Sequence, residues 1–553
     1  MSENDFDVVI IGSGAGGGAS AWALAKSGIK VLVIEAGPSY DPETDFYLNQ
    51  DNWEQPFPKK MQDNDRYTFA NGQPLSDRFD DLRSWNHLTG RYNNQEQRIS
   101  FGYHRVMGVG GSSLHFTGEA HRLNPRSMQI KTDFNVGADW PLTYEELEPF
   151  YMKAEEAVGV AGSNDDRVHP RSRPYPQAAH ELSYASKFLQ KAGTQLGMTF
   201  IPNSLAVLSS PYKERPNCNY CGGCLRGCPR KDKGTIDITY LKEARETGLC
   251  TIRKNTTVTK IITDENNRVA GIQCSDGDES YFLKTKYLVL SGGAVESPRL
   301  LLNSSAEHSP YGLCNESGQV GQNFMETLLW TSSGLSPNNL GSHRGLPVDC
   351  ISWDYNAPDA IEDVIGGCRF APSLAESDLV GPIAYGRRVV GGWGYSHKER
   401  MKKHFGKMLS VSGIAECLPN SKSYISLERN REDRYGVPLA KISSYLDDMA
   451  IRRIAFMAKK CRSLLSVLNV EILEEFSSYD IFSSTHVFGT CRMGNDAKNS
   501  VVDAWCKSHR WQNLYIMDAS VFPSSGGGES PGLTIQALAL RASKRLAKVI
   551  QKD

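Results

Sequence analysis

The sequence has no excess of charge of either sign. Its 62 Lys and Arg residues nearly balance its 63 Asp and Glu residues, which leaves a formal net charge of −1 at pH 7. Proteins that bind nucleic acid usually carry a strong basic patch or stripe. The balance gives no support for such a partner, so we expect no nucleic acid among the ligands of this chain.

Long apolar runs and targeting signals are also missing. No apolar run reaches the roughly 18 residues that span a bilayer, and Met1–Phe6 is polar and acidic, without a basic region or twin arginine. We expect no signal or transmembrane segment in the sequence itself.

There are no internal repeats or low-complexity tracts. At 553 residues the chain is too long for one compact core, so we expect two or more closely joined domains.

Cysteine is plentiful, with 13 residues, but only four of them cluster. A scattered distribution is typical of reduced, buried thiols and not of a secreted disulfide framework. We therefore expect folding in the cytoplasm, and leave open later export with a partner to the periplasm or membrane surface. The scattered residues are Cys250, Cys274, Cys314, Cys350, Cys368, Cys417, Cys461, Cys491 and Cys506.

The four clustered cysteines, Cys218, Cys221, Cys224 and Cys228, have the spacing C-x2-C-x2-C-x3-C-P. Bacterial ferredoxins hold an iron–sulfur cluster with this run. Structural zinc normally uses two well-separated pairs of ligands, so the spacing favours a cluster over zinc. Since the fourth Cys of a ferredoxin run serves a second cluster, either a 3Fe-4S or a 4Fe-4S centre is compatible with the spacing. Unmetallated structural thiols remain the alternative.

A dinucleotide-binding turn is predicted near the start of the chain. The apolar run 6–11 reads as a buried strand, followed by a turn with Gly12, Ser13, Gly14, Ala15 and Gly17 and by a helix over 19–27. A second strand over 28–35 ends at Glu35, whose carboxylate is placed to bind a ribose diol. Both NAD and FAD use such a turn, and the turn alone does not choose between them.

Several further motifs lie in a characteristic order along the chain. A second glycine loop spans 105–116, a third strand and helix span 287–302, and the segments Thr485–Gly494 and Leu514–Arg541 close the sequence. In this order the motifs resemble the glucose-methanol-choline (GMC) family of FAD oxidoreductases. The resemblance extends from Asp7 to Lys548.

The resemblance implies an α/β fold with two parts. The first is a Rossmann-type FAD-binding domain assembled from residues 1–40, 100–130, 250–325 and 484–553. The second is an α+β substrate domain with a large antiparallel sheet, from 41–99, 131–249 and 326–483, which includes the cysteine loop 215–235. FAD contacts implied by the resemblance, besides the turn residues and Glu35, are Ala36, Gly110, Gly111, Ser112, His115, Val258, Gly292, Asp518, Ala519, Pro531 and Leu533.

Two residues are implied to be catalytic. His486 occupies the position of the family's active-site histidine, and an imidazole near its ordinary pKa can accept the proton of an alcohol. Ser530 stands where relatives usually carry Asn or His, and a hydroxyl cannot act as a strong base. Ser530 also precedes a Pro and a long amphipathic pattern, so it is either a helix N-cap or a substrate ligand, or both.

His115 matches the position at which some sugar-oxidising members tether FAD covalently; the alternative is simple packing against the flavin ring. Relatives with comparable cysteine segments are FAD-dependent sugar dehydrogenase subunits that carry clusters. They imply a small export-tagged subunit and a cytochrome or quinone-linked acceptor as partners, and a sugar, glycoside or polyol as substrate, before a lipophilic or aromatic alcohol. Aromatic residues between 50 and 95 (Trp53, Phe57, Tyr67, Trp85 and Tyr92) are candidates for a lid that stacks on a sugar.

Two other activities remain open. The chain is alternatively an oxidase that delivers electrons to oxygen, or a redox-silent lyase of the same fold, because fold does not fix function.

Overall fold

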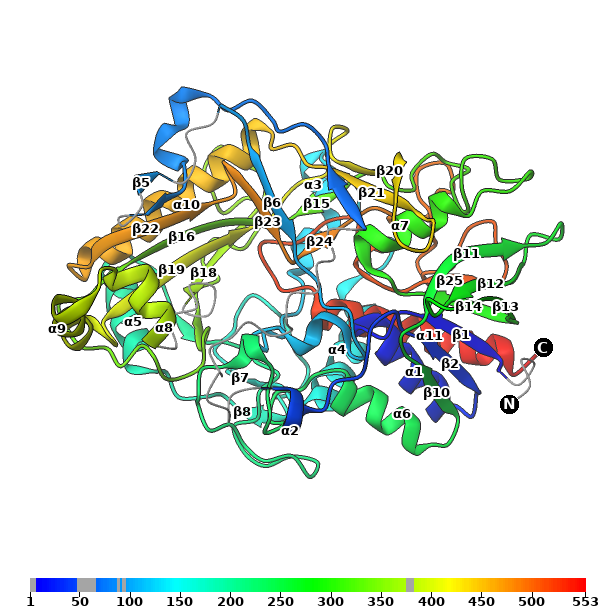
Figure 1. Cartoon of the computed structure of the whole chain (residues 1–553), viewed down its shortest axis with the longest axis horizontal. Helices are drawn as coiled ribbons and strands as arrows, with labels where there is room; N and C mark the ends of the chain where they lie inside the picture. Colours follow the sequence, from blue (N-terminus) through cyan, green and yellow to red (C-terminus); the bar gives the residue numbers. More distant parts are fainter. Residues whose placement is uncertain (1–5, 47–65, 87–89, 92–95, 374–381) are drawn as a thin grey trace.

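The computed structural model describes residues 6–46, 66–86, 90–91, 96–373 and 382–553. One end of the molecule, the right-hand end in Figure 1, is built on a five-stranded sheet in the order β10-β2-β1-β14-β25, in which every neighbouring pair is parallel. The strands are short runs rich in Val, Ile and Leu, as expected where both faces of a sheet are covered. Their bounds are Val8–Ile11 (β1), Val31–Ile34 (β2), Cys250–Arg253 (β10), Tyr287–Leu290 (β14) and Leu514–Ile516 (β25).

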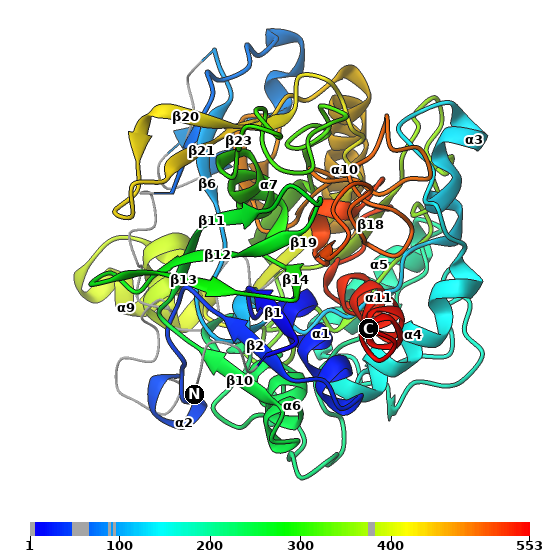
Figure 2. The same ribbon diagram turned by 90° about the vertical axis from the view of Figure 1, so that its right-hand side faces the viewer.

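Helices cover one face of this sheet and a smaller sheet covers the other. Helices α1 (Ala15–Lys26) and α11 (Gly532–Ile550) lie side by side to the right of its strands in Figure 2, with α4 (Tyr144–Val158) packed against α11. The antiparallel sheet β11-β12-β13 lies on the opposite side (Figure 2) and comprises Thr257–Thr263, Val269–Ser275 and Ser280–Lys284. The first and last parts of the sequence therefore share one layered unit.

A second, six-stranded antiparallel sheet forms the other end of the molecule, in the order β18-β19-β16-β22-β4-β5. Helix α10 (Asp448–Val467) packs on it along β16 and β19. The strands are Cys368–Pro372 (β18), Met408–Ala415 (β19), Leu328–Leu335 (β16), Glu471–Ser477 (β22), Trp85–Asn86 (β4) and Gly90–Arg91 (β5). The expected fold class, a Rossmann-type unit joined to a part with a large antiparallel sheet, is confirmed.

Smaller elements connect the two ends. They include α7 (Gly293–Asn303), α5 (Tyr184–Gln195), β6 (Ile99–Tyr103), β23 (Ile481–Ser484), β24 (Val487–Phe488), and β20 (Tyr424–Glu432) paired with β21 (Pro438–Ser443) and β3 (Tyr67–Phe69). No helix in the described part of the chain is long and apolar enough to cross a membrane. All 13 cysteines are free, and the nine scattered ones are buried.

The proposed aromatic lid falls largely outside the described residues, since Trp53, Phe57 and Tyr92 are not among them. Tyr67 packs edge-on against Phe69 and Tyr103, with ring centroids 5.6 and 5.9 Å away. For Tyr67 this is ordinary core packing.

Candidate active site

The predicted dinucleotide turn connects β1 to α1, and its glycines are required by close backbone contacts. Gly12 has a φ of 92°. A Cβ on Gly16 would lie 1.7 Å from the carbonyl oxygen of Met517, and one on Gly17 would lie 1.9 Å from that of Gly12. No side chain of the described residues caps the start of α1 at Gly14. The free N–H groups and the positive helix end fit a pyrophosphate.

Glu35 follows β2 and holds the turn in place. Its Oε2 accepts hydrogen bonds from the backbone N–H of Ser13 (3.1 Å) and from the Ser13 hydroxyl (2.6 Å), while Oε1 accepts one from Gly37 (2.9 Å). A carboxylate has about four lone-pair directions, so acceptor capacity remains for a ribose diol. Ala36 follows Glu35 in the sequence. The carbonyl of Glu35 accepts a hydrogen bond from the N–H of Thr256 (2.9 Å). This bond brings the start of β11, which includes Val258, close to the turn.

The second glycine loop lies directly against the first. The N–H of Gly110 donates to the Ser13 hydroxyl (3.1 Å), and a Cβ on Gly111 would lie 2.8 Å from the Cα of Gly14. Gly110 and Gly111 have φ values of 105° and 57°, a conformation that glycine adopts without strain. Ser112 is exposed beside them and accepts a hydrogen bond from Val106. Two loops about 95 residues apart in the sequence thus form one cradle with the predicted turn.

Asp518 and the start of α7 form the next part of the cradle. The Asp518 carboxylate accepts hydrogen bonds from the N–H of Gly293 (2.9 Å), the Ser297 hydroxyl (2.6 Å) and the N–H of Ser520 (2.8 Å). Gly292 precedes Gly293 at the N-terminus of α7. Asp518 therefore joins the end of β25 to α7 with its side chain, and its contact with a cofactor remains a prediction.

The N-terminus of α11 points into open space. A Cβ added at Gly532 would meet no atom within 4 Å, and no described side chain caps the helix, whose N-cap residue is Pro531. Two other predicted cofactor contacts, Ala519 and Leu533, are buried. The expectation that Ser530 caps this helix, with Pro at its first position, is wrong. The helix begins one residue later, and the Ser530 hydroxyl has a different partner.

That partner is Glu119, which sequence reasoning missed. Ser530 donates its hydroxyl to Glu119 Oε2 (2.9 Å), and Arg369 Nη2 donates to the same oxygen (2.7 Å). The N–H of Ser530 donates to His121 Nδ1 (3.0 Å), while Asn203 bonds both His121 and Glu119. Glu119, His121, Arg369 and Ser530 are all buried. The sequence contains one weak indication of this cluster. Glu119 and His121 are two residues apart, and residues with that spacing on an extended segment lie on the same face.

The electrostatics of this cluster fix its charges. Although burial raises it, the pKa of Glu119 is held at about 2 by Arg369, by His121 and by the hydrogen bond from Ser530. Burial lowers the pKa of His121 to about 4, so this ring is neutral at pH 7 and can accept from Ser530. Nη1 of Arg369 is buried and has no hydrogen-bond partner among the described residues.

His486 lies between β23 and β24 and is only partly exposed. Its backbone carbonyl accepts from Thr327 (3.0 Å) and from the Ser484 hydroxyl (2.9 Å), which fixes the main chain at this position. Burial lowers the pKa of the imidazole to about 4; Glu119 opposes this shift and Arg369 adds to it. The ring is therefore a neutral base at pH 7, within the electrostatic field of the Glu119–Arg369 pair.

His115 lies on the loop that follows Gly111, close to a buried lysine. Burial and the charge of Lys233 lower the pKa of His115 to about 3. The Lys233 ammonium donates to the carbonyls of Leu114 (3.1 Å), Phe116 (3.0 Å) and Cys224 (2.6 Å). Lys233 thus ties the His115 loop to the cysteine loop.

Comparison with known proteins identifies the family. The sequence matches the family models described as GMC oxidoreductase over residues 105–328 and 419–539, and an FAD-binding domain over residues 7–46. The chain belongs to the GMC oxidoreductase family. It is therefore an enzyme of the oxidoreductase class, and the match at its N-terminal segment supports FAD as the dinucleotide.

Individual GMC relatives match along nearly the whole chain. The fructose dehydrogenase large subunit of Gluconobacter japonicus is 25% identical and is covered over 97% of both chains. The 6'''-hydroxyparomomycin C oxidase of Streptomyces lividus is 26% identical, over 99% of this chain and 92% of the relative. The crystal structure of pyridoxine 4-oxidase from Mesorbium loti aligns with a TM-score of 0.65 at 18% identity, over 98% and 99% of the two chains. This last similarity shows the fold.

The structure gives no support for a metal centre in the cysteine loop of this GMC protein. Burial raises the pKa of Cys218 to about 12 and of Cys228 to about 11, and raises that of Cys224 well above its ordinary value. Cys221 is exposed, and Cys228 donates to Asp232 (3.1 Å). Within the described residues, no three Cys, His, Asp or Glu side chains come together as metal ligands.

Proposed function

We propose that this protein is an FAD-dependent dehydrogenase that oxidises a CH–OH group of a sugar, glycoside or polyol. With FAD bound, the flavin supplies the two-electron acceptor for the hydride that leaves the carbinol carbon. The observation that carries the proposal is His486, a neutral imidazole beside the buried Glu119–Arg369 pair. Removal of a hydride from an alcohol requires removal of its hydroxyl proton, and His486 accepts that proton.

Ser530 and Glu119 replace the second catalytic group that relatives usually carry. Because Ser530 already donates to Glu119, its hydroxyl oxygen remains free to accept the hydrogen bond of a substrate hydroxyl. Glu119 positions that hydroxyl and favours the protonated form of His486 after proton transfer. Arg369 in turn keeps Glu119 ionised. In this scheme Ser530 touches substrate, and Glu119 acts through Ser530 and His486.

The cofactor residues are proposed from the cradle described above. The turn residues Gly12, Ser13, Gly14, Ala15 and Gly17 would hold the pyrophosphate, Glu35 the ribose, and the N-terminus of α11 at Pro531 the reduced flavin. A positive helix end favours negative charge that develops on a ring in front of it. His115, kept neutral by burial, would either bond FAD covalently or pack on its ring.

The polar wall of the site supports a polyhydroxylated substrate over a lipophilic one. Arg369 Nη1 lacks a partner, and burying an unpaired donor costs free energy unless a ligand supplies an acceptor. The apolar part of a lipophilic alcohol has no acceptor for this donor and would leave it unpaired. A sugar, glycoside or polyol satisfies it with a hydroxyl oxygen.

The acceptor of the electrons distinguishes a dehydrogenase from an oxidase, and both kinds occur among the relatives. The G. japonicus relative is named as a large subunit, which supports a dehydrogenase made of several subunits. The small export-tagged subunit and the cytochrome or quinone-linked acceptor are proposed from the family resemblance alone. A 3Fe-4S or 4Fe-4S relay is supported by the cysteine spacing alone, whereas the arrangement of the thiols gives it no support. No step beyond the flavin is therefore assigned.

An anaerobic titration tests the proposal. Purified protein is mixed with a panel of sugars, polyols and long-chain alcohols while the flavin absorbance is followed. Bleaching by a polyol supports the proposal, and bleaching only by lipophilic alcohols overturns the substrate class. A flavin that no alcohol bleaches points to the lyase alternative. Peroxide formed in step with substrate consumption in air identifies an oxidase, and iron analysis with EPR decides the cluster.

A further inference from the structure

An exposed tip projects from the six-stranded sheet at the end of the molecule opposite both termini (Figure 1). It consists of α8 (Pro382–Tyr385), the single turn Gly386–Val390 and α9 (Gly394–His404), and we name residues 382–407 the α9 tip. None of the eleven residues of α9 is buried. A helix this short is marginal in water without an apolar face packed against a partner. Met401 and Phe405 pack against the buried cluster of Tyr385, Val389, Val390, Met408 and Leu473. Most other side chains of α9 are exposed.

Large apolar side chains are concentrated on this tip. Trp393 is 88% exposed, Tyr395 is 79% exposed and Ile383 is 62% exposed. They make up three of the eight exposed large hydrophobic residues in the described part of the chain, within a stretch of 13 residues. Single exposed apolar residues need no explanation, whereas several within one short segment favour an interaction site.

The tip is also strongly basic in a protein that is neutral overall. It carries seven Lys and Arg residues and one acidic residue, Glu399. Lys402 pairs with Glu399 (2.9 Å) and Arg388 with Glu474 (2.5 Å), while Lys398 and Lys403 are exposed. The cationic residues are Arg387, Arg388, Lys398, Arg400, Lys402, Lys403 and Lys407.

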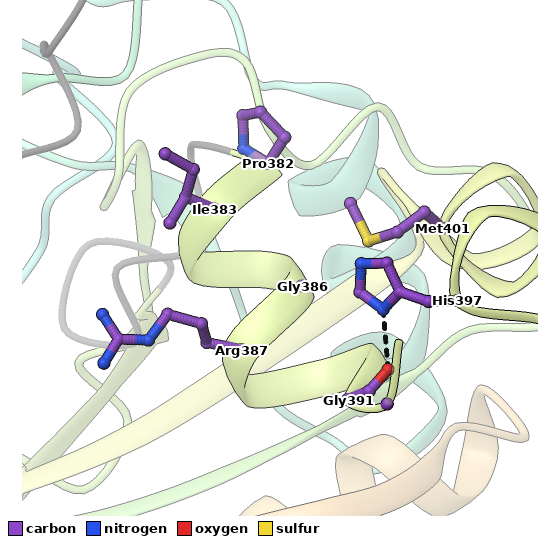
Figure 3. A pocket seen from close by; sticks show the side chains of 8 residues that line it. Pro382, Ile383, Gly386, Arg387, Gly391, His397 and Met401 are labelled. Atoms are coloured by element: carbon purple, nitrogen blue, oxygen red, sulfur yellow. Dashed lines mark hydrogen bonds between the residues drawn. The ribbon is translucent and has the colours of Figure 1, made fainter. Parts of the chain in front are cut away.

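A groove of about 690 Å³ lies between the two helical pieces of the tip. Its lining includes Pro382, Ile383, Arg387, His397 and Met401. Figure 3 shows Ile383 and Arg387 to the left of the helical segment 382–391 and His397 and Met401 to its right, with His397 Nδ1 bonded to the carbonyl of Gly391 (2.7 Å). Apolar and cationic side chains therefore line the same groove. This pairing suits an amphiphile with a negative head group.

We propose that the α9 tip docks this protein on the surface of an anionic lipid bilayer. Trp and Tyr favour the boundary between lipid head groups and acyl chains, and Lys and Arg are attracted to anionic head groups. An acidic protein partner would use the positive charge, but it would not by itself account for the three exposed apolar side chains of the tip. The described part of the chain has no helix that spans a membrane, so the attachment is peripheral. None of the proposed catalytic residues lies in the tip.

Vesicle flotation of the purified holoenzyme tests the proposal. We expect the protein to float with vesicles that contain phosphatidylglycerol, to float weakly with phosphatidylcholine alone, and to release as salt is added, because salt screens the attraction. The charge variant K398Q/K402Q/K403Q should lose about 10-fold or more in affinity for the anionic vesicles. The apolar variant W393S/Y395S should bind more weakly at every salt concentration.

The matched control is Y311S/K254Q/K284Q, which removes an 81% exposed aromatic residue and two exposed lysines elsewhere. It should bind vesicles like the unmodified protein. Unchanged flavin absorbance in every variant shows that the fold is retained. Absence of binding to anionic vesicles, or equal loss in the control, overturns the proposal. In the first case retention on an immobilised acidic polypeptide would assign the tip to a protein partner instead.

Discussion

The hydroxyl of Ser530 donates a 2.9 Å hydrogen bond to the carboxylate of Glu119, a residue 411 positions away in the sequence. Both residues are buried, and Glu119, which also pairs with Arg369, acts electrostatically on His486. This bond gives the hydroxyl of Ser530 a defined partner in the structure.

Replacing Ser530 with Ala should slow flavin reduction by substrate about 10-fold, because one hydrogen bond to an ionised group is lost. Ser530→Thr keeps the hydroxyl and should retain most of the rate. Stopped-flow absorbance under anaerobic conditions measures both. Equal rates for the Ala and Thr variants would show that the hydroxyl does not contribute.

His486→Asn should lower the rate of flavin reduction by about 10²- to 10⁴-fold, the usual contribution of a general base. Since burial lowers the pKa of His486 to about 4, the neutral, active form persists well below pH 6.5. The rate for the unmodified enzyme should therefore fall only as pH drops toward 4. An acidic limb centred near pH 6.5 would contradict the burial of this imidazole in the active state.

Arg369→Lys keeps a positive charge beside Glu119 but removes the fork of donors. If Nη1 binds a substrate hydroxyl, KM should rise while kcat changes less, and the rise should be larger for a sugar than for a simple alcohol. Steady-state kinetics with both substrates measures the split. A fall in kcat alone would limit Arg369 to holding Glu119.

Breaking the Glu119–Arg369 pair should also reduce stability. Glu119→Gln leaves a buried guanidinium uncompensated and should cost about 3–5 kcal/mol in the free energy of unfolding. The double variant Glu119→Gln, Arg369→Met should recover part of that loss, as a double-mutant cycle in urea would show. Additive losses would mean that the two groups do not interact energetically.

Gly17→Ala should yield a protein that binds FAD weakly, because the new Cβ would lie 1.9 Å from the Gly12 carbonyl and displace the turn. Gly102→Ala is the control, since its Cβ would contact only the His104 ring at 3.4 Å. The flavin-to-protein absorbance ratio after gel filtration is the measurement. A fully yellow Gly17→Ala protein would remove the turn from the cofactor site.

The parts of this architecture that depend on local pattern could be predicted from the sequence. The strand, glycine turn, helix and second strand up to Glu35 follow from apolar periodicity and turn chemistry over about 30 neighbouring residues. His486 was indicated by its motif, and its role remains a prediction. The N-cap role for Ser530 was wrong because a buried carboxylate competed successfully for its hydroxyl.

Residues that act through distant contacts could not be predicted. Nothing near Glu119 or Arg369 in the sequence indicates that they meet, since about 250 residues separate them. The exposure of the α9 tip could not be predicted either. A basic helical segment in a sequence indicates only an ordinary surface helix, and its packing cannot be inferred from the pattern. The cysteine spacing predicted a cluster that the arrangement of the thiols does not show.

The five-stranded sheet takes its first two strands from the first 34 residues and its last strand from Leu514–Ile516. During synthesis the ribosome therefore releases the edge strand β25 and helix α11 long after the first two strands. Contacts that close such long loops form slowly. With the N-terminus of α11 in the proposed FAD site, that site is complete only once α11 has emerged, and deletion of α11 should yield apoprotein for chaperones and proteases.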